Sequence, residues 1–162
     1  MKVDLMALLS VITIFGITGC QSAPPTPFTP EQLSVLQSQG FKNTSYGWTL
    51  APQEKILFRH NKATLTPKSK AAIKHIASAL TSVGLRHARV DGHTDNNGDS
   101  DYNRSLSLRR ANAVANYYAK SGNIPRSNLT IMGLGEKCPV ASNNTLQGRA
   151  ENRRASIIIT SP

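Results

Sequence analysis

The chain has 162 residues, enough for one ordinary domain and a short additional segment. Nineteen Lys and Arg residues against nine Asp and Glu give a formal charge of +10, and 39% of the residues are hydrophobic. This composition supports a real core and excludes a chain that is disordered over most of its length. The two cysteines are too few for a disulfide framework or a four-ligand zinc site, and the low aromatic content argues against stacking on single-stranded nucleic acid.

Residues 1–19 have the features of a lipoprotein signal peptide. Lys2 gives a positive start, residues 5–17 are mostly apolar, and small residues lead into Cys20. The apolar run is too short to span a membrane, since a spanning helix needs roughly 20 apolar residues, so it favours a cleaved secretory signal over a buried helix. The pattern resembles the bacterial lipobox, which implies an N-acyl diglyceride on Cys20. Gln21 after the cysteine implies sorting to the outer membrane, with the protein facing the periplasm.

Export changes the meaning of the positive charge. A basic exported protein does not meet chromosomal DNA, so the expected anionic partners are a membrane surface, the cell wall or an acidic protein. Once Cys20 is acylated, Cys138 is a lone thiol in an oxidising compartment. Such a cysteine is either buried and inert, which we favour, or available for intermolecular pairing.

Residues 20–28 read as a lipidated, proline-rich tether, and residues 29–54 as a lead segment. Thr29 is the expected N-cap of a short helix, with Pro30 at its first position and Gln32 completing a capping box. A helix of about three turns is not stable alone, so it has to pack on the domain or on a partner. The lead segment is therefore a candidate partner-binding switch, whose apolar side chains either complete the core or form a contact surface: Leu33, Leu36, Phe41 and Trp48.

Residues 55–162 alternate between strand and helix patterns. Strands are expected over residues 56–58, 88–92, 129–132 and 156–160, and helices over residues 66–84, 103–120 and 143–152. The helix after Thr66 carries the i, i+3, i+4, i+7 apolar stripe that an amphipathic helix buries. The order βαβαβαβ predicts an α/β sandwich, with the helices packed on one mixed four-stranded sheet.

Residues 91–110 hold four of the nine acidic residues, which suggests a site for a cation in an otherwise basic chain. One interpretation is calcium. An EF-hand loop needs glycine at its sixth position and Glu at its twelfth, but here Gly98 is the fourth residue and Leu106 is the twelfth. A second is catalysis, with His93 and Asp95 activating Ser107. No nucleophile elbow surrounds any serine, and no motif pairs a nucleophile with a base, so we expect no enzyme.

A third interpretation is recognition of a small zwitterion. Asp95 would face an ammonium group, and Arg110, about two turns into the following helix, would reach back towards the loop to face a carboxylate. Gly98 would let the ligand approach the backbone, and the helix start near Asn103 would offer free N–H groups. The alternative is an Asp95–Arg110 salt bridge that only orders the loop, and the residues alone leave this choice open.

A series of motifs resembles the OmpA-like peptidoglycan-binding domain. The matching residues are Gly92-His93-Thr94-Asp95, Asn103, Leu106-Ser107, Arg110-Ala111, Gly133-Leu134-Gly135-Glu136, Pro139-Val140 and residues 148–154. This resemblance implies that Asp95 and Arg110 hold the diaminopimelate of the wall stem peptide, and that Asn61 and Gly98 line the same pocket. Three further arginines could contact the wall, but we expect them to order the last loop: Arg149, Arg153 and Arg154.

The lead segment resembles that of a signalling lipoprotein within this family. The resemblance implies capture of a periplasmic inhibitor that otherwise silences an inner-membrane diguanylate cyclase, so that cyclic-di-GMP rises. The alternative is a purely structural anchor between outer membrane and wall. A structural anchor would bury the lead segment's apolar side chains or do without them.

Overall fold

The computed structural model describes residues 28–50 and 56–160. The predicted signal peptide, Cys20 and almost all of the tether lie outside these ranges. No helix within them is long and apolar enough to cross a membrane.

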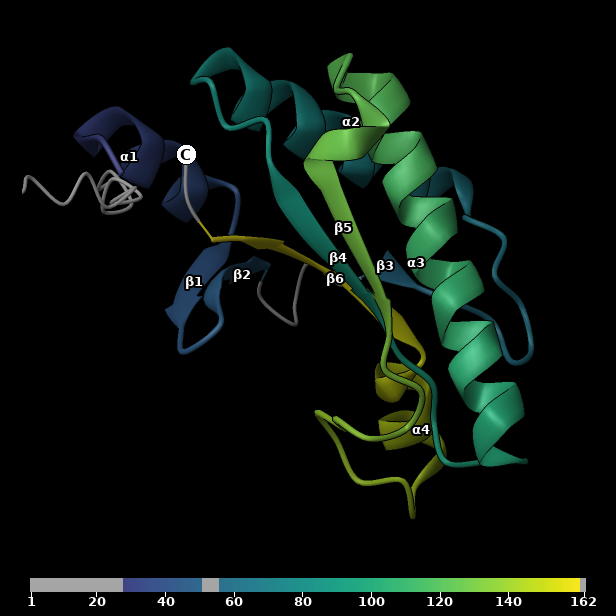
Figure 1. The fold of residues 1–162 in the computed structure, drawn as a ribbon. Helices are drawn as coiled ribbons and strands as arrows, with labels where there is room; N and C mark the ends of the chain where they lie inside the picture. The colour runs from purple at the N-terminus through teal and green to yellow at the C-terminus, as the bar shows by residue number, and fades with distance from the viewer. Residues whose placement is uncertain (1–27, 51–55, 161–162) are drawn as a thin grey trace, which may run out of the picture.

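The described elements form one mixed sheet with helices on one face (Figure 1). The sheet order is β1-β2-β6-β4-β5, β3 also pairs with β6, and only β4 and β5 run parallel. The α/β sandwich is confirmed, with these bounds: α1 (Pro30–Ser38), β1 (Phe41–Thr44), β2 (Gly47–Leu50), β3 (Ile56–Leu57), α2 (Pro67–Ser82), β4 (Ala88–Gly92), α3 (Ser100–Gly122), η2 (Arg126–Asn128), β5 (Leu129–Gly133), α4 (Leu146–Asn152) and β6 (Arg154–Ile159).

The lead segment adds two strands that the sequence analysis did not predict. The sheet has six strands in the described part of the chain, where four were expected. The β1–β2 hairpin turns at residues 45–46, and β2 begins at Gly47, whose φ of 113° favours glycine. Strand β2 pairs with β6 through Trp48 and Ile159. The lead segment therefore belongs to the same sheet as the domain that follows it.

The expected capping box starts α1. The Thr29 hydroxyl accepts from the Gln32 N–H, and the Gln32 side chain accepts from the Thr29 N–H. Leu36 is 0% exposed and Phe41 is 1% exposed, so both complete the core. Leu33 and Trp48 are only half-buried. In this conformation Leu36 and Phe41 form no contact surface, because the domain itself covers them.

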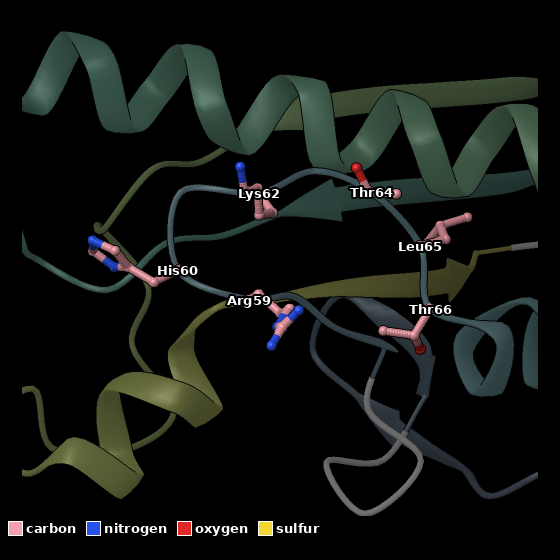
Figure 2. Close-up of a pocket in the computed structure, with 6 residues that line it drawn as sticks. All are labelled: Arg59, His60, Lys62, Thr64, Leu65 and Thr66. Carbon is pink, nitrogen blue, oxygen red and sulfur yellow. The ribbon is translucent and has the colours of Figure 1, made fainter.

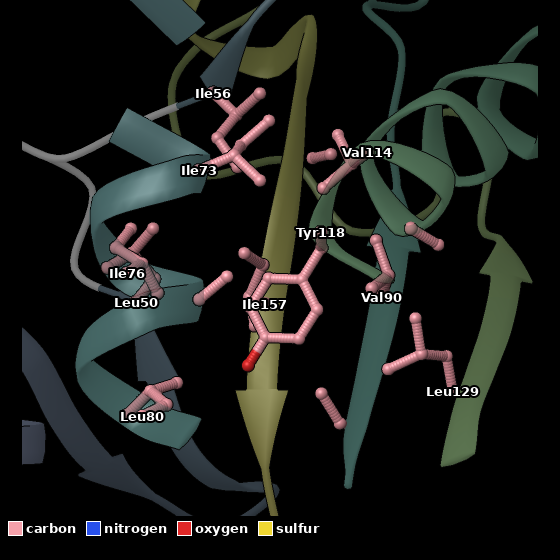
Figure 3. Packing of buried hydrophobic residues seen from close by; sticks show 14 of the residues in the cluster. Leu50, Ile56, Ile73, Ile76, Leu80, Val90, Val114, Tyr118, Leu129 and Ile157 are labelled. Atoms are coloured by element: carbon pink, nitrogen blue, oxygen red, sulfur yellow. The ribbon is translucent and has the colours of Figure 1, made fainter. Parts of the chain in front are cut away.

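The main core lies between the sheet and the helices α2 and α3 (Figure 3). The predicted stripe of α2 faces inward, and α3 contributes Val114 and Tyr118. Helix α3 lies directly on β4, since a Cβ on Gly92 would overlap the main-chain carbonyl of Ser107. This close contact places the start of α3 beside the carboxyl end of β4.

We predict that docking of α1 depends on Leu36. Leu36→Ala should lower the free energy of unfolding by about 2–5 kcal/mol, because it removes a fully buried side chain and leaves a cavity. Leu33→Ala is the matched control on the same helix and should cost clearly less, since Leu33 is half-buried. Urea denaturation measures both. Equal losses for the two variants would show that α1 is not held by the core.

Candidate functional site

The predicted site residues gather at one end of the sheet. The loop 93–99 follows β4, the loop 58–66 joins β3 to α2, and α4 runs into β6 beside them (Figure 1). Hydrogen bonds of Arg110, Asp95 and Asn103 connect these loops to α3 and to the end of α4. The structure therefore brings together residues that lie up to about half the chain apart.

Arg110 is fully buried and holds two of these loops. Its Nε donates to the Lys62 carbonyl at 2.9 Å, Nη1 to the His93 carbonyl at 2.8 Å and Nη2 to the Arg59 carbonyl at 3.2 Å. The guanidinium also lies over the Phe58 ring, 5.3 Å from its centroid. Burial lowers the pKa of Arg110 to about 10, which leaves it charged at neutral pH. Two of its five N–H groups make no hydrogen bond within the described residues.

Asp95 supplies the opposite charge but does not bond to Arg110. One of its oxygens pairs with Nη1 of Arg153 at 2.9 Å, and the other accepts from the Asn97 N–H at 3.3 Å. The Asp95 carboxylate lies near enough to counteract the lowering of the Arg110 pKa. The interpretation of Asp95 and Arg110 as a salt bridge is therefore wrong, because Arg153 takes that position. We expect Arg153 to order the last loop, and this bond connects it to the loop after β4.

Asn103 braces the loop that carries Asp95. Its side-chain nitrogen donates to the Asn97 carbonyl at 3.0 Å and to Glu136 at 2.6 Å. Gly98 lies in the same loop with a φ of 91°, and the space where a Cβ would stand is open. The backbone at Gly98 is therefore not covered on the side where a Cβ would stand.

The start of α3 differs from the prediction. The helix begins at Ser100, three residues before the expected Asn103, and the Asp99 side chain caps it by accepting from the N–H groups of Asp101 and Tyr102. The N–H of Asn103 donates to the Asp99 carbonyl. The expectation of free N–H groups near Asn103 is wrong, because a carboxylate of the chain already occupies the helix start.

Asn61 lies in the turn that holds Arg110. The turn closes through a hydrogen bond from the Lys62 N–H to the Arg59 carbonyl, and Asn61 adopts a φ of 51° within it. The same loop borders a cavity of about 510 Å³ (Figure 2). Its lining carries two cations and a histidine: Arg59, His60, Lys62, Thr64, Leu65 and Thr66. This cavity therefore carries positive charge, but Asn61 and the other predicted site residues do not line it.

The other two interpretations lose their support in the described residues. Within them no group of three or more His, Cys, Asp or Glu side chains is placed to hold a metal ion. The Ser107 hydroxyl donates to the Arg104 carbonyl and accepts from the Gly135 N–H, so no base activates it. Burial and the neighbouring Arg154 lower the pKa of His93 to about 3, so this imidazole is neutral.

The remaining arginines order the last loops. Arg149 donates to the Asn143 carbonyl at 2.7 Å, and Arg154 donates to the Cys138 carbonyl at 3.1 Å. Cys138 is exposed, so the prediction of a buried cysteine is wrong. Sequence reasoning also missed the carbonyls that hold Arg110 and the role of Glu136. Main-chain acceptors leave no signal in residue identity.

Comparison with known proteins adds a family and two full-length relatives. The OmpA family model matches residues 57–153. The lipoprotein YfiB of Escherichia coli K12 is 53% identical over 94% of each chain, and the outer-membrane lipoprotein YfiB of Pseudomonas aeruginosa is 44% identical over 96% of this chain and 92% of that one. The solved peptidoglycan-associated lipoprotein of Burkholderia pseudomallei superposes with a TM-score of 0.60 at 29% identity, covering 64% of this chain and 87% of that one.

We predict that His93 makes stability depend on pH. As the pH falls from about 6.5 towards 3, the unfolded chain takes up a proton that the folded chain excludes at His93. This group should lower the free energy of unfolding by about 1.4 kcal/mol per pH unit in that window. His93→Gln should remove this part of the slope in urea denaturation at pH 4 to 7. His87→Gln, at an exposed position, is the control. An unchanged slope in His93→Gln would contradict the assignment.

Proposed function

The chain belongs to the OmpA family, and we propose from the geometry above that it binds peptidoglycan through the diaminopimelate of the stem peptide. It is a lipoprotein of the outer membrane that faces the periplasm. We further propose that it acts as a binding protein without catalytic activity. The observation that supports this proposal most directly is that Arg110 and Asp95 are both buried and lie close together but are not bonded to each other.

The free end of diaminopimelate is an amino-carboxylate, and its two charges match these two side chains. The carboxylate would accept from the remaining N–H groups of Arg110, and the ammonium would share Asp95 with Arg153. With Arg153 included, the three side chains carry a net charge of +1. A ligand therefore needs a carboxylate to bind favourably at this site. Asp95 favours a ligand that also carries an ammonium group over a simple anion.

We predict that Asp95→Ala and Arg110→Lys each reduce binding to purified, diaminopimelate-containing sacculi at least ten-fold. Hydrogen bonds between charged groups contribute roughly 1.5–3 kcal/mol each, and lysine cannot present two parallel N–H groups. Asp101→Ala is the matched control, because it removes one exposed carboxylate at the start of α3, the helix that carries Arg110. Co-sedimentation measures binding, and circular dichroism checks the fold. Wild-type sedimentation of both variants would sink the proposal.

We also propose that an N-acyl diglyceride on Cys20 provides the membrane anchor. Cys20 lies outside the described residues, so the proposal rests on the lipobox-like sequence and on the two lipoprotein relatives. A single acyl chain binds membranes only weakly, whereas a diglyceride with a third chain holds the protein firmly.

The finer proposal is that the protein sequesters a periplasmic, YfiR-like inhibitor of an inner-membrane diguanylate cyclase, which raises cyclic-di-GMP. It is supported by the similarity to two YfiB lipoproteins over nearly the whole chain, lead segment included. Leu36 and Phe41 are buried, so in the docked lead segment only Leu33 and Trp48 are partly exposed for contact with a partner. Contact through all four side chains would require α1 and the hairpin to leave the core.

The second candidate is a purely structural anchor between outer membrane and wall. The burial of Leu36 and Phe41 favours this candidate, because side chains that complete the core need no partner to explain them. The solved relative from Burkholderia pseudomallei is named a peptidoglycan-associated lipoprotein. Both candidates use the same wall site and differ only in the lead segment.

Cyclic-di-GMP levels separate the two candidates. In cells lacking the gene, we expect expression of the wild-type chain to raise cyclic-di-GMP. Leu36→Ala should change this level, because it weakens docking of α1 and also removes one of the four proposed contact side chains. Leu33→Ala is the control. A structural anchor would instead restore retention of periplasmic enzymes and leave cyclic-di-GMP unchanged in every strain.

A further inference from the structure

A second cavity lies on the helix-free face of the sheet. Its volume is about 470 Å³, within the range of small-molecule sites. Side chains alternate along a strand, so Ile158 faces this cavity while its neighbours in β6 face the core. The loop that carries Val140 closes one side. The lining surface is mostly apolar, and five of the residues that line it have apolar side chains: Met132, Leu134, Pro139, Val140 and Ile158.

Two buried polar side chains line this cavity with unpartnered atoms. Arg154 is 8% exposed, and its Nη1 has no hydrogen-bond partner in the described part of the chain; only Nη2 is used, by the Cys138 carbonyl. His93 is 4% exposed, and its Nδ1 is likewise unpartnered. Each such atom has lost water without gaining a replacement, so a ligand that supplies an acceptor would recover that loss.

The charge of the cavity favours an anion. Arg89 is neutralised by Asp91, to which it donates twice, at 3.0 and 2.9 Å. Burial lowers the pKa of Arg154 only to about 10, so it stays charged, while His93 is neutral. No carboxylate within the described residues makes a hydrogen bond to Arg154. Arg154 is therefore left without a directly bonded counter-ion beside the apolar lining of the cavity.

We propose that this cavity binds a small carboxylate with an apolar body. The carboxylate accepts from Nη1 of Arg154 and from His93 in its Nδ1–H form, and the apolar body packs on Met132 and Ile158. The site lies on the opposite face of the sheet from α3, the helix that carries Arg110, and shares no side chain with the proposed wall site. Two sources have this chemistry: a fatty acid, and the carboxyl-terminal residue of an apolar peptide.

Cys138 gives a direct measurement, because it is exposed and lines the cavity. In the lipidated protein Cys20 is a thioether, so Cys138 is the free thiol of the mature chain. We expect N-acetyl-leucine or octanoate to slow its reaction with a thiol reagent in a saturable way. N-acetyl-leucinamide and octanol, which lack the charge, should not. Comparing the two carboxylates distinguishes the peptide source from the lipid source.

Variants test the two halves of the site. Arg154→Gln should shift the midpoint of protection at least ten-fold, as expected for loss of a charged hydrogen bond. Met132→Glu, at an exposed position, should do the same by repelling the carboxylate. Leu146→Glu is the matched control, since Leu146 is exposed and lies outside the cavity. Sedimentation of Met132→Glu with sacculi should stay at the wild-type level. Equal protection by charged and uncharged probes, or unchanged midpoints in Arg154→Gln and Met132→Glu, would overturn the proposal.

Discussion

The buried guanidinium of Arg110 is the interaction on which the candidate site depends. Three main-chain carbonyls from two separate loops accept from it, so its position fixes the loop after β3 and the end of β4 relative to α3. A buried charge is costly unless it is hydrogen-bonded, and carbonyl dipoles satisfy it without cancelling its charge. The residue is therefore structural and remains electrostatically available. That combination lets one side chain hold the pocket together and still attract a carboxylate.

The negative side of the site is arranged differently. Asp95 is bonded to Arg153, which comes from the short segment between α4 and β6. This pair connects the last loop of the chain to the loop after β4. A carboxylate oxygen can accept more than one hydrogen bond, so a ligand ammonium does not have to displace Arg153 to reach Asp95. The pocket thus holds its shape before a ligand arrives, which reduces the ordering cost of binding.

Much of this could be predicted from sequence because the signals are local. The capping residues Thr29 and Thr66, the strand over residues 88–92 and the apolar stripe of α2 each follow from a few adjacent side chains. The β1–β2 hairpin was missed because each strand has only four residues and neither shows an alternation of buried and exposed side chains. The Asp95–Arg153 pair spans 58 residues, and no local pattern reports which of several arginines is the partner.

The buried lead segment sets an energetic condition on any signalling role. Full burial of a leucine or phenylalanine side chain contributes roughly 1.5–3 kcal/mol, so Leu36 and Phe41 together hold the docked state by about 3–6 kcal/mol. A partner that binds only the undocked state would lose roughly 10²–10⁴-fold in apparent affinity to this cost. The total stability of a domain is only about 5–15 kcal/mol, so undocking takes a large share of it. A wall ligand that favoured the undocked state would lower this cost and thereby couple wall binding to partner capture.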